Sequence, residues 1–176
     1  MSEKTSLWQL WREDYDTHGR DATLPGFRAV AAHRFGVWRL RVRPRLVRAP
    51  LTIIYRRMYR RHRNRYGIEI PHSVTLGRRV RVEHQGGIVV HGMAVIGDDV
   101  IIRQGVTIGN RHLDRPDDVP VIGSRVNIGS GAVILGAIKV GDDVSIGSNA
   151  VVLDDVPSGS TVVGPRAAIR PRDVRA

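Results

Sequence analysis

Residues 121–152 read VIGSRVNIGSGAVILGAIKVGDDVSIGSNAVV and carry a branched aliphatic residue at every sixth position. The series is Ile122, Ile128, Ile134, Val140, Ile146 and Val152. Two shorter series with the same period come before it, namely Val90, Ile96, Ile102 and Ile108, and earlier Ile70, Leu76 and Val82. A fixed period of this kind indicates one small structural unit that is stacked many times.

A strict period of six is not produced by the alternation of ordinary strands, whose period is two. It is produced by a chain that turns a corner after each short strand, so that every aliphatic side chain points to one central axis. Three such strands make one triangular coil. The sequence therefore predicts a mainly β protein, a left-handed parallel β-helix preceded by a short α-helical N-terminal domain. A glycine-rich antiparallel barrel is the alternative, and the single register of 121–152 disfavours it.

The register of the repeat breaks twice. Val90 follows Val82 by eight residues, and Ile122 follows Ile108 by fourteen. The second break contains GNRHLDRPDDVP, whose charges and prolines are typical of a loop. We therefore predict a loop over 109–121, and loops on rigid scaffolds are common places for functional sites.

The front of the chain has a helical period and most of the charge. Residues 1–66 contain 16 Lys and Arg but 5 Asp and Glu, whereas the two kinds balance over the rest of the chain. Prolines at 25, 44 and 50 divide this region into helices. The predicted domains are a basic helical domain over 1–66, a β-helix over 67–165 and a C-terminal tail over 166–176.

Cysteine is absent, which excludes disulfides, a thiolate nucleophile and thiolate metal ligands. The N-terminal residues MSEKTSLWQLWREDYD lack the pattern of a secretory signal, and no apolar run is long enough to cross a membrane. We expect a cytoplasmic protein.

Several segments resemble the serine acetyltransferase family of hexapeptide acyltransferases. They are GIEIPHSVTLGRRVRVEHQGGIVV, IIRQGVTIGN and VVLDDVPSGSTVVGPRA, with GRDATLPGFRAVAAHRFGVW upstream. Within the family, RAPLTIIYR, GRRVRVEHQGG and VTIGNR are most similar to the colanic acid acetyltransferase branch. The resemblance implies transfer of acetyl from acetyl-CoA to a hydroxyl of an exopolysaccharide sugar. O-acetylation of L-serine for cysteine synthesis remains the alternative within the family.

The resemblance implies a catalytic pair. His84, in EHQGG, stands where the family has its catalytic histidine, and Glu69, in GIEI, stands where the family usually has an aspartate that orients the ring. Imidazole titrates near neutral pH, so it suits the removal of a hydroxyl proton. The histidines show no spacing typical of a metal site, and we expect no metal.

The residues implied for acceptor binding are Asp21, Glu83, Arg111 and His112. The serine enzymes have an Arg-His pair just before the proline that re-enters the coil, but here Asp118 and Val119 precede that proline. Serine's carboxylate needs a cationic partner. The departure therefore favours a neutral, sugar-like acceptor. Asp21 has a second interpretation as a helix cap.

The family binds CoA in the groove between neighbouring subunits. The matching positions are Gly109, Asn110, Ser130 and Ser148, although small residues also suit every corner of such a coil. The resemblance therefore implies a homotrimer, and the sequence leaves open whether trimers pair into hexamers.

The stretch RRMYRRHRNRY supports another class of function, an arginine-rich module that binds an anionic surface. Of the possible surfaces we favour a membrane holding a lipid-linked saccharide over nucleic acid, which would be compatible with the enzyme. A purely structural β-helix is a further alternative, and His84 with Glu69 argues against it.

Overall fold

The computed structural model describes residues 5–164 and 166, so the expected tail lies almost entirely outside the described residues. The chain begins with three α-helices and one 3-10 helix, α1 (Leu7–Thr17), α2 (Pro25–Trp38), η1 (Arg39–Arg41) and α3 (Arg45–Tyr66). Ser6 caps α1 in a capping box with Gln9. Pro25 opens α2, and Gly67 ends α3 in the left-handed conformation that glycine tolerates best. The expectation that Pro50 separates two helices is wrong, because Pro50 lies inside α3.

Within the described residues, fourteen short strands follow the helices. They are β1 (Ile68–Glu69), β2 (Thr75–Leu76), β3 (Arg81–Val82), β4 (Ile88–Val90), β5 (Val95–Ile96), β6 (Ile101–Ile102), β7 (Thr107–Gly109), β8 (Val121–Ile122), β9 (Asn127–Ile128), β10 (Val133–Leu135), β11 (Lys139–Val140), β12 (Ser145–Ile146), β13 (Val151–Val152) and β14 (Thr161–Val162).

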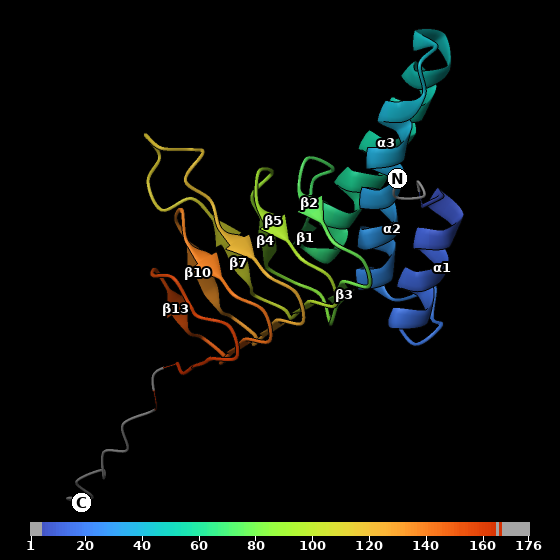
Figure 1. Ribbon diagram of the computed structural model, residues 1–176. Helices are drawn as coiled ribbons and strands as arrows, with labels where there is room; N and C mark the ends of the chain where they lie inside the picture. The colour runs from blue at the N-terminus through green and yellow to red at the C-terminus, as the bar shows by residue number, and fades with distance from the viewer. Residues whose placement is uncertain (1–4, 165, 167–176) are drawn as a thin grey trace, which may run out of the picture.

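The strands form three parallel sheets, and neighbours within a sheet come from successive coils of the chain. One sheet has the order β1-β4-β7-β10-β13, the second β11-β8-β5-β2 and the third β14-β12-β9-β6-β3. The coils stack into the prism seen in Figure 1. The prediction of a left-handed parallel β-helix behind N-terminal helices is confirmed.

The core is a column of aliphatic side chains along the axis of the prism. All members of the six-residue series are buried except Leu76, which is partly buried. A second buried series precedes it by two residues, which the sequence analysis did not identify. It consists of Ile68, Val74, Val80, Ile88, Ala94, Val100, Val106, Val126, Ala132, Ile138, Val144 and Ala150. Side chains two apart on an extended chain face the same way, so each coil edge contributes a pair to the core.

The strand register locates both breaks in the repeat. Val89 pairs with Thr107, and Val133 with Val151, which is a coil of eighteen residues in each case. The first coil is two residues longer, because Ile68 pairs with Ile88, and the extra residues lie between β3 and β4. The coil between Thr107 and Val133 is eight longer, and its extra residues form the segment after β7 that stands away from the stack in Figure 1.

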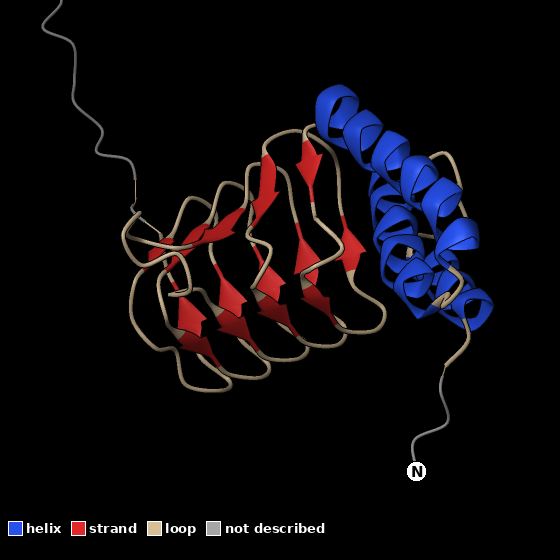
Figure 2. Ribbon diagram, turned by 90° about the horizontal axis from the view of Figure 1, so that it is seen from above, coloured by secondary structure: helices blue, strands red, loops and turns tan. Residues whose placement is uncertain are grey.

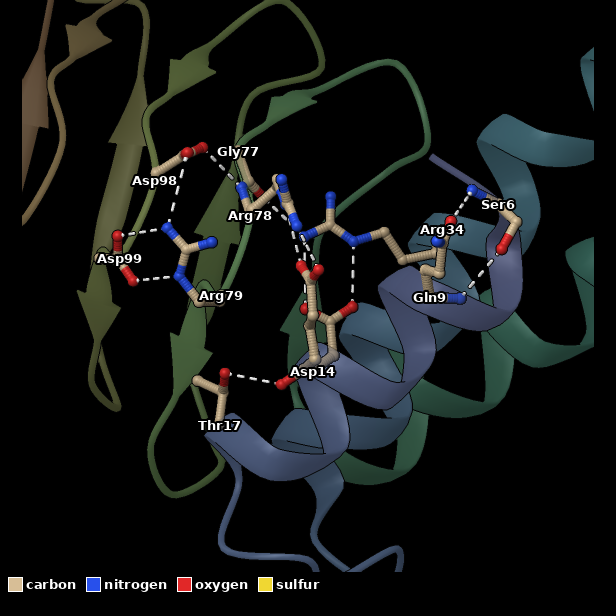
Figure 3. Close-up of polar contacts among 11 residues, drawn as sticks. Ser6, Gln9, Asp14, Thr17, Arg34, Gly77, Arg78, Arg79, Asp98 and Asp99 are labelled. Atoms are coloured by element: carbon tan, nitrogen blue, oxygen red, sulfur yellow. Dashed lines mark hydrogen bonds and ion pairs between the residues drawn. The ribbon is translucent and has the colours of Figure 1, made fainter. Parts of the chain in front are cut away.

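The helices cover one end of the coil stack, next to β1, β2 and β3 (Figures 1 and 2). Arg34 on α2 forms a buried ion pair with Asp14 on α1, to which its Nε donates at 3.0 Å (Figure 3). Its Nη1 donates to the Leu76 carbonyl of the first coil at 2.8 Å and so joins the helices to the β-helix. This contact fixes α1 and α2 against the first coil. In the described part of the chain, no helix is long and apolar enough to cross a membrane.

Candidate active site

His84 lies in the two-residue expansion of the first coil, between β3 and β4. Its backbone is left-handed, with φ of 67°, and its side chain is exposed. The residue borders a pocket of about 210 Å³ between the end of β3 and the start of α2, together with Arg81, Glu83 and Pro25. The start of α2 can approach the end of β3 this closely only because residue 26 is glycine. A Cβ at Gly26 would lie 2.0 Å from the Val82 carbonyl oxygen. The geometry gives His84 an accessible ring beside a pocket formed by both domains.

His18 lines the same pocket, and the sequence offered no signal for this role. Its ring is buried, its Nδ1 lies 2.7 Å from the Asp14 carbonyl oxygen, and its Nε2 accepts the backbone N–H of Val82 at 3.2 Å. Because Nε2 accepts, Nδ1 carries the proton, and burial lowers the pKa of the ring. Nδ1 therefore fixes the ring to α1, and Nε2 holds the end of β3, the strand that leads to His84.

Glu69 lies on β1 and is not hydrogen-bonded to His84. Its Oε1 accepts the hydroxyl of Tyr59, on α3, at 3.0 Å. Burial, and then this hydrogen bond to the carboxylate, raise the pKa of Tyr59, so the phenol keeps its proton. Within one protomer the structure thus links Glu69 to the helical domain and does not bring the expected pair together.

Glu83 comes just before His84 and is neutralised by two arginines. Arg103, on the next coil, places Nε 2.9 Å from Glu83 Oε2, and Arg81 places Nε 3.2 Å from Oε1. Glu83 therefore lines the pocket as part of a cluster with two arginines, and this cluster has a net positive charge.

The other residues expected to bind the acceptor do not gather around His84. Asp21 lies in the turn before α2, where its Oδ1 accepts the Thr23 N–H at 2.7 Å and the Thr23 hydroxyl at 2.6 Å. These hydrogen bonds lower the pKa of Asp21. Arg111 and His112 are exposed in the loop after β7, where the His112 carbonyl accepts the Asn110 amide at 2.8 Å.

The positions expected to bind CoA lie at opposite ends of the parallel strands of one sheet. Ser130 and Ser148 lie in the corners that lead into β10 and β13, with their hydroxyl oxygens 3.3 Å apart. Gly109 ends β7 and Asn110 follows it, so these two lie at the opposite ends of the parallel strands. Ser130 and Ser148 are neighbours, but a single protomer does not join them to Gly109 and Asn110.

Across residues 5–164 and 166, His, Asp and Glu side chains form no group of three that could hold a metal ion. The chemistry that these side chains offer is proton transfer at His84, within reach of a pocket large enough for part of a small acceptor.

Comparison with known proteins places this geometry among acetyltransferases. Residues 120–154 match the family model described as bacterial transferase hexapeptide (six repeats). The chain is 41% identical over 140 residues to the putative colanic acid biosynthesis acetyltransferase WcaB of Escherichia coli, and the match covers 79% of the chain and 84% of that protein. It is 37% identical to the serine acetyltransferase of Synechococcus elongatus, with 80% of the chain covered.

The solved structures give the same picture. The serine acetyltransferase of Neisseria gonorrhoeae superposes with a TM-score of 0.74 at 29% identity, covering 99% of this chain and 70% of that one. A serine acetyltransferase in complex with CoA superposes with a TM-score of 0.70 at 29% identity, covering 89% of this chain and 66% of the other. The chain spans 54% of the Synechococcus enzyme and 63% of its Helicobacter pylori counterpart.

Proposed function

The chain belongs to the serine acetyltransferase family of hexapeptide-repeat acyltransferases, and on that basis we propose that it transfers acetyl from acetyl-CoA to a sugar hydroxyl of an exopolysaccharide precursor. The observation that carries the proposal is the exposed ring of His84 at the pocket between β3 and α2. The cytoplasm, where acetyl-CoA is available, is the proposed location.

His84 acts as the general base. Its ring takes the proton of the acceptor hydroxyl while the alcohol oxygen bonds to the thioester carbonyl carbon. The carbon–sulfur bond then breaks, and the CoA sulfur leaves with the proton that His84 returns. Acetyl-CoA supplies the activated acyl group, and the chain supplies the base and the acceptor pocket.

Glu69 is proposed to orient His84, and Tyr59 competes with His84 for the Glu69 carboxylate. A carboxylate on the far ring nitrogen would fix the tautomer and stabilise the imidazolium. In the protomer the carboxylate is held by Tyr59 instead. Tyr59→Phe releases Glu69 and keeps its charge, whereas Glu69→Gln removes the charge. If Glu69 serves His84, Glu69→Gln lowers kcat and Tyr59→Phe does not; equal effects would make the contact with α3 purely structural.

A neutral acceptor fits the charges around His84. Glu83 is already paired with Arg103 and Arg81, so it is a poor partner for the ammonium group of an amino acid. Asp21 is engaged by Thr23. Arg111 and His112 in the loop after β7 are the proposed contacts for the outer part of a saccharide, because loops of this kind adapt to extended ligands.

A homotrimer is proposed for the assembly, and pairing of trimers into hexamers stays open. Ser130 with Ser148 lies at one end of a sheet and Gly109 with Asn110 at the other. If all four contact one CoA, two of them must come from a neighbouring subunit.

A contact with an anionic membrane is proposed for the outer face of α3. Leu46 is 91% exposed and Ile53 is 60% exposed, while arginines fill the exposed face of the second half of the helix. This combination of apolar and cationic side chains is typical of a helix that lies on a membrane surface. Sedimentation with vesicles of anionic lipid, against vesicles of neutral lipid, tests the contact.

The deciding experiment follows release of the CoA thiol by purified protein with acetyl-CoA. One series receives L-serine, and another receives free and lipid-linked saccharides. His84→Ala should lower turnover by about 10²- to 10⁴-fold. His91→Ala is the matched control, because His91 lies on the adjacent coil and its Nδ1 only accepts the Met93 N–H at 3.3 Å. Release with serine alone, or normal turnover in His84→Ala, would overturn the proposal.

A further inference from the structure

A second concave site lies between the three helices. Its volume is about 560 Å³, and its apolar surface comes from Trp11 on α1, Phe27 and Ala31 on α2 and Met58 on α3. The Trp11 indole N–H donates to the Ala31 carbonyl at 3.1 Å, so the ring offers only its apolar surface. This helical groove, as we call it, suits a hydrocarbon chain.

Two arginines border the helical groove at one side. Arg28 donates from Nε to the Ala22 carbonyl at 2.9 Å and from Nη1 to the Tyr66 hydroxyl at 3.3 Å. Arg61 borders it from α3, a helix without any Asp or Glu. Within the described residues neither arginine forms an ion pair with an acidic side chain. The two cations therefore leave positive charge at the edge of an apolar surface.

His62 gives a second sign that the helical groove is completed by a ligand. Its side chain lines the groove and is 6% exposed, yet its Nδ1 has no hydrogen-bond partner in the described structure. Buried polar atoms are nearly always satisfied, and exceptions call for an explanation. The described structure supplies no partner for this nitrogen in the wall of the groove.

The helical groove and the His84 pocket meet at the end of α3. The Phe27 ring packs edge-on against the His18 ring of the His84 pocket, with centroids 6.0 Å apart. Tyr66, which accepts from Arg28, also accepts the Gly86 N–H through its carbonyl at 2.8 Å. Gly86 is two residues after His84. A ligand whose charged group contacts Arg28 is therefore next to the segment from His84 to Gly86.

We propose that the helical groove binds the lipid-phosphate part of the acceptor, a hydrocarbon chain joined to the sugar through a phosphate or diphosphate. The chain lies on Trp11, Phe27 and Met58, the phosphate contacts Arg28 and Arg61, and the sugar reaches His84. This inference rests on the proposed function, because it assigns the substrate class of the same active site.

A binding experiment separates this inference from the proposed catalysis. Dodecyl phosphate, used below its micelle concentration, is titrated while the tryptophan fluorescence is followed. Dodecyl maltoside supplies the chain without the anion, and inorganic phosphate supplies the anion without the chain. The inference predicts saturable binding of dodecyl phosphate, weakened roughly tenfold to a hundredfold by Arg28→Gln or Arg61→Gln. Arg125→Gln, at a corner of the β-helix where Arg125 pairs with Asp143, should bind like the parent.

Each contrary result has a distinct meaning. If dodecyl maltoside bound as tightly as dodecyl phosphate, the helical groove would be an apolar surface without preference for an anion. If inorganic phosphate bound tightly, the groove would be an anion site that does not need the hydrocarbon chain. Equal weakening in Arg125→Gln would make the binding an effect of the overall positive charge and not of the helical groove. Any of these overturns the inference and leaves acetyl transfer untouched. Conversely, loss of acetyl transfer with binding of dodecyl phosphate retained would count against the proposed function alone.

Discussion

Arg103 binds the carboxylate that precedes the candidate catalytic histidine: its Nε lies 2.9 Å from Oε2 of Glu83. The two residues belong to successive coils, so the stacking of the β-helix itself brings the cation to the pocket. Arg103 also donates to the Asn127 side chain and to the Ile128 carbonyl, which holds it in place. The charge of Glu83 is thus cancelled by a positioned partner.

Arg103→Gln should move the acceptor preference toward hydroxyl acceptors that carry an ammonium group, such as L-serine. Without Arg103, Glu83 keeps only Arg81 as an ion-pair partner, so its carboxylate is less fully neutralised and attracts an ammonium group more strongly. We expect the ratio of kcat/KM for L-serine to kcat/KM for a neutral sugar to rise several-fold. The acetyl-CoA KM is measured in parallel to detect an effect on the donor. Arg125→Gln is the control, because Arg125 pairs with Asp143 at another corner. An unchanged ratio would show that Glu83 does not face the acceptor.

His33 should make the fold sensitive to mild acid. Its Nε2 bonds to the Val74 carbonyl at 3.0 Å, and burial lowers the pKa of the ring from 6.5 to about 4. The neutral ring is favoured in the folded state, so its contribution is complete above pH 6.5 and is lost as the pH falls toward 4. Between pH 7.5 and pH 5 this loss amounts to about 2 kcal/mol.

Urea unfolding at several pH values checks the role of His33. His33→Gln retains a donor for Val74 and removes the titration, so its stability should fall less steeply in this pH range. His18, His62 and His72 also have pKa values lowered by burial and remain in the variant. A residual slope is therefore expected. If the free energy of unfolding changes with pH equally steeply in parent and variant, the folded state accepts a proton on His33 as readily as the unfolded chain does.

The sequence predicted the β-helix because one side chain per strand must reach the axis, which leaves a period that no other arrangement repeats so strictly. It missed the second series, from Ile68 to Ala150, because alanine, valine and isoleucine share these positions and no single residue type marks the period. The position of His84 followed from the motif EHQGG, and the structure places it in the two-residue expansion of the coil.

Contacts between the domains could not be predicted from the sequence. The role of His18 depends on how α1 meets β3, and the link between Glu69 and Tyr59 depends on the direction of α3. These contacts join residues that are far apart in the chain and follow no period. The same is true of the helical groove, whose lining comes from three helices.

Arg34 should be essential for docking the helical domain. It pairs with Asp14, both side chains are buried, and its Nη1 also donates to the Leu76 carbonyl. Arg34→Met strands a buried carboxylate and should cost about 3–5 kcal/mol in the free energy of unfolding. Arg78→Met is the control, since Arg78 pairs with Glu13 at the surface and should cost about 1 kcal/mol or less. Chemical denaturation compares the two, and similar losses would contradict a special role for the buried pair.

Gly97 should be irreplaceable because of the spacing between coils. Neighbouring strands in a sheet lie roughly 4.8 Å apart. A Cβ at Gly97 would lie 2.5 Å from the Gly123 carbonyl oxygen, which is backbone and is fixed by its own coil. Gly97→Ala must therefore separate two coils or break their hydrogen bonds, and we expect a loss of about 3 kcal/mol or more.

Gly159→Ala is the matched control for Gly97→Ala. Gly159 has a positive φ of 72° but no atom within 4 Å of an added Cβ, so its substitution costs only backbone strain of about 1–2 kcal/mol. Urea unfolding of the two variants separates steric from conformational effects. If both variants lose the same free energy of unfolding, the coils can relax around an added methyl group. The close stacking at Gly97 would then not be the reason that residue 97 is glycine.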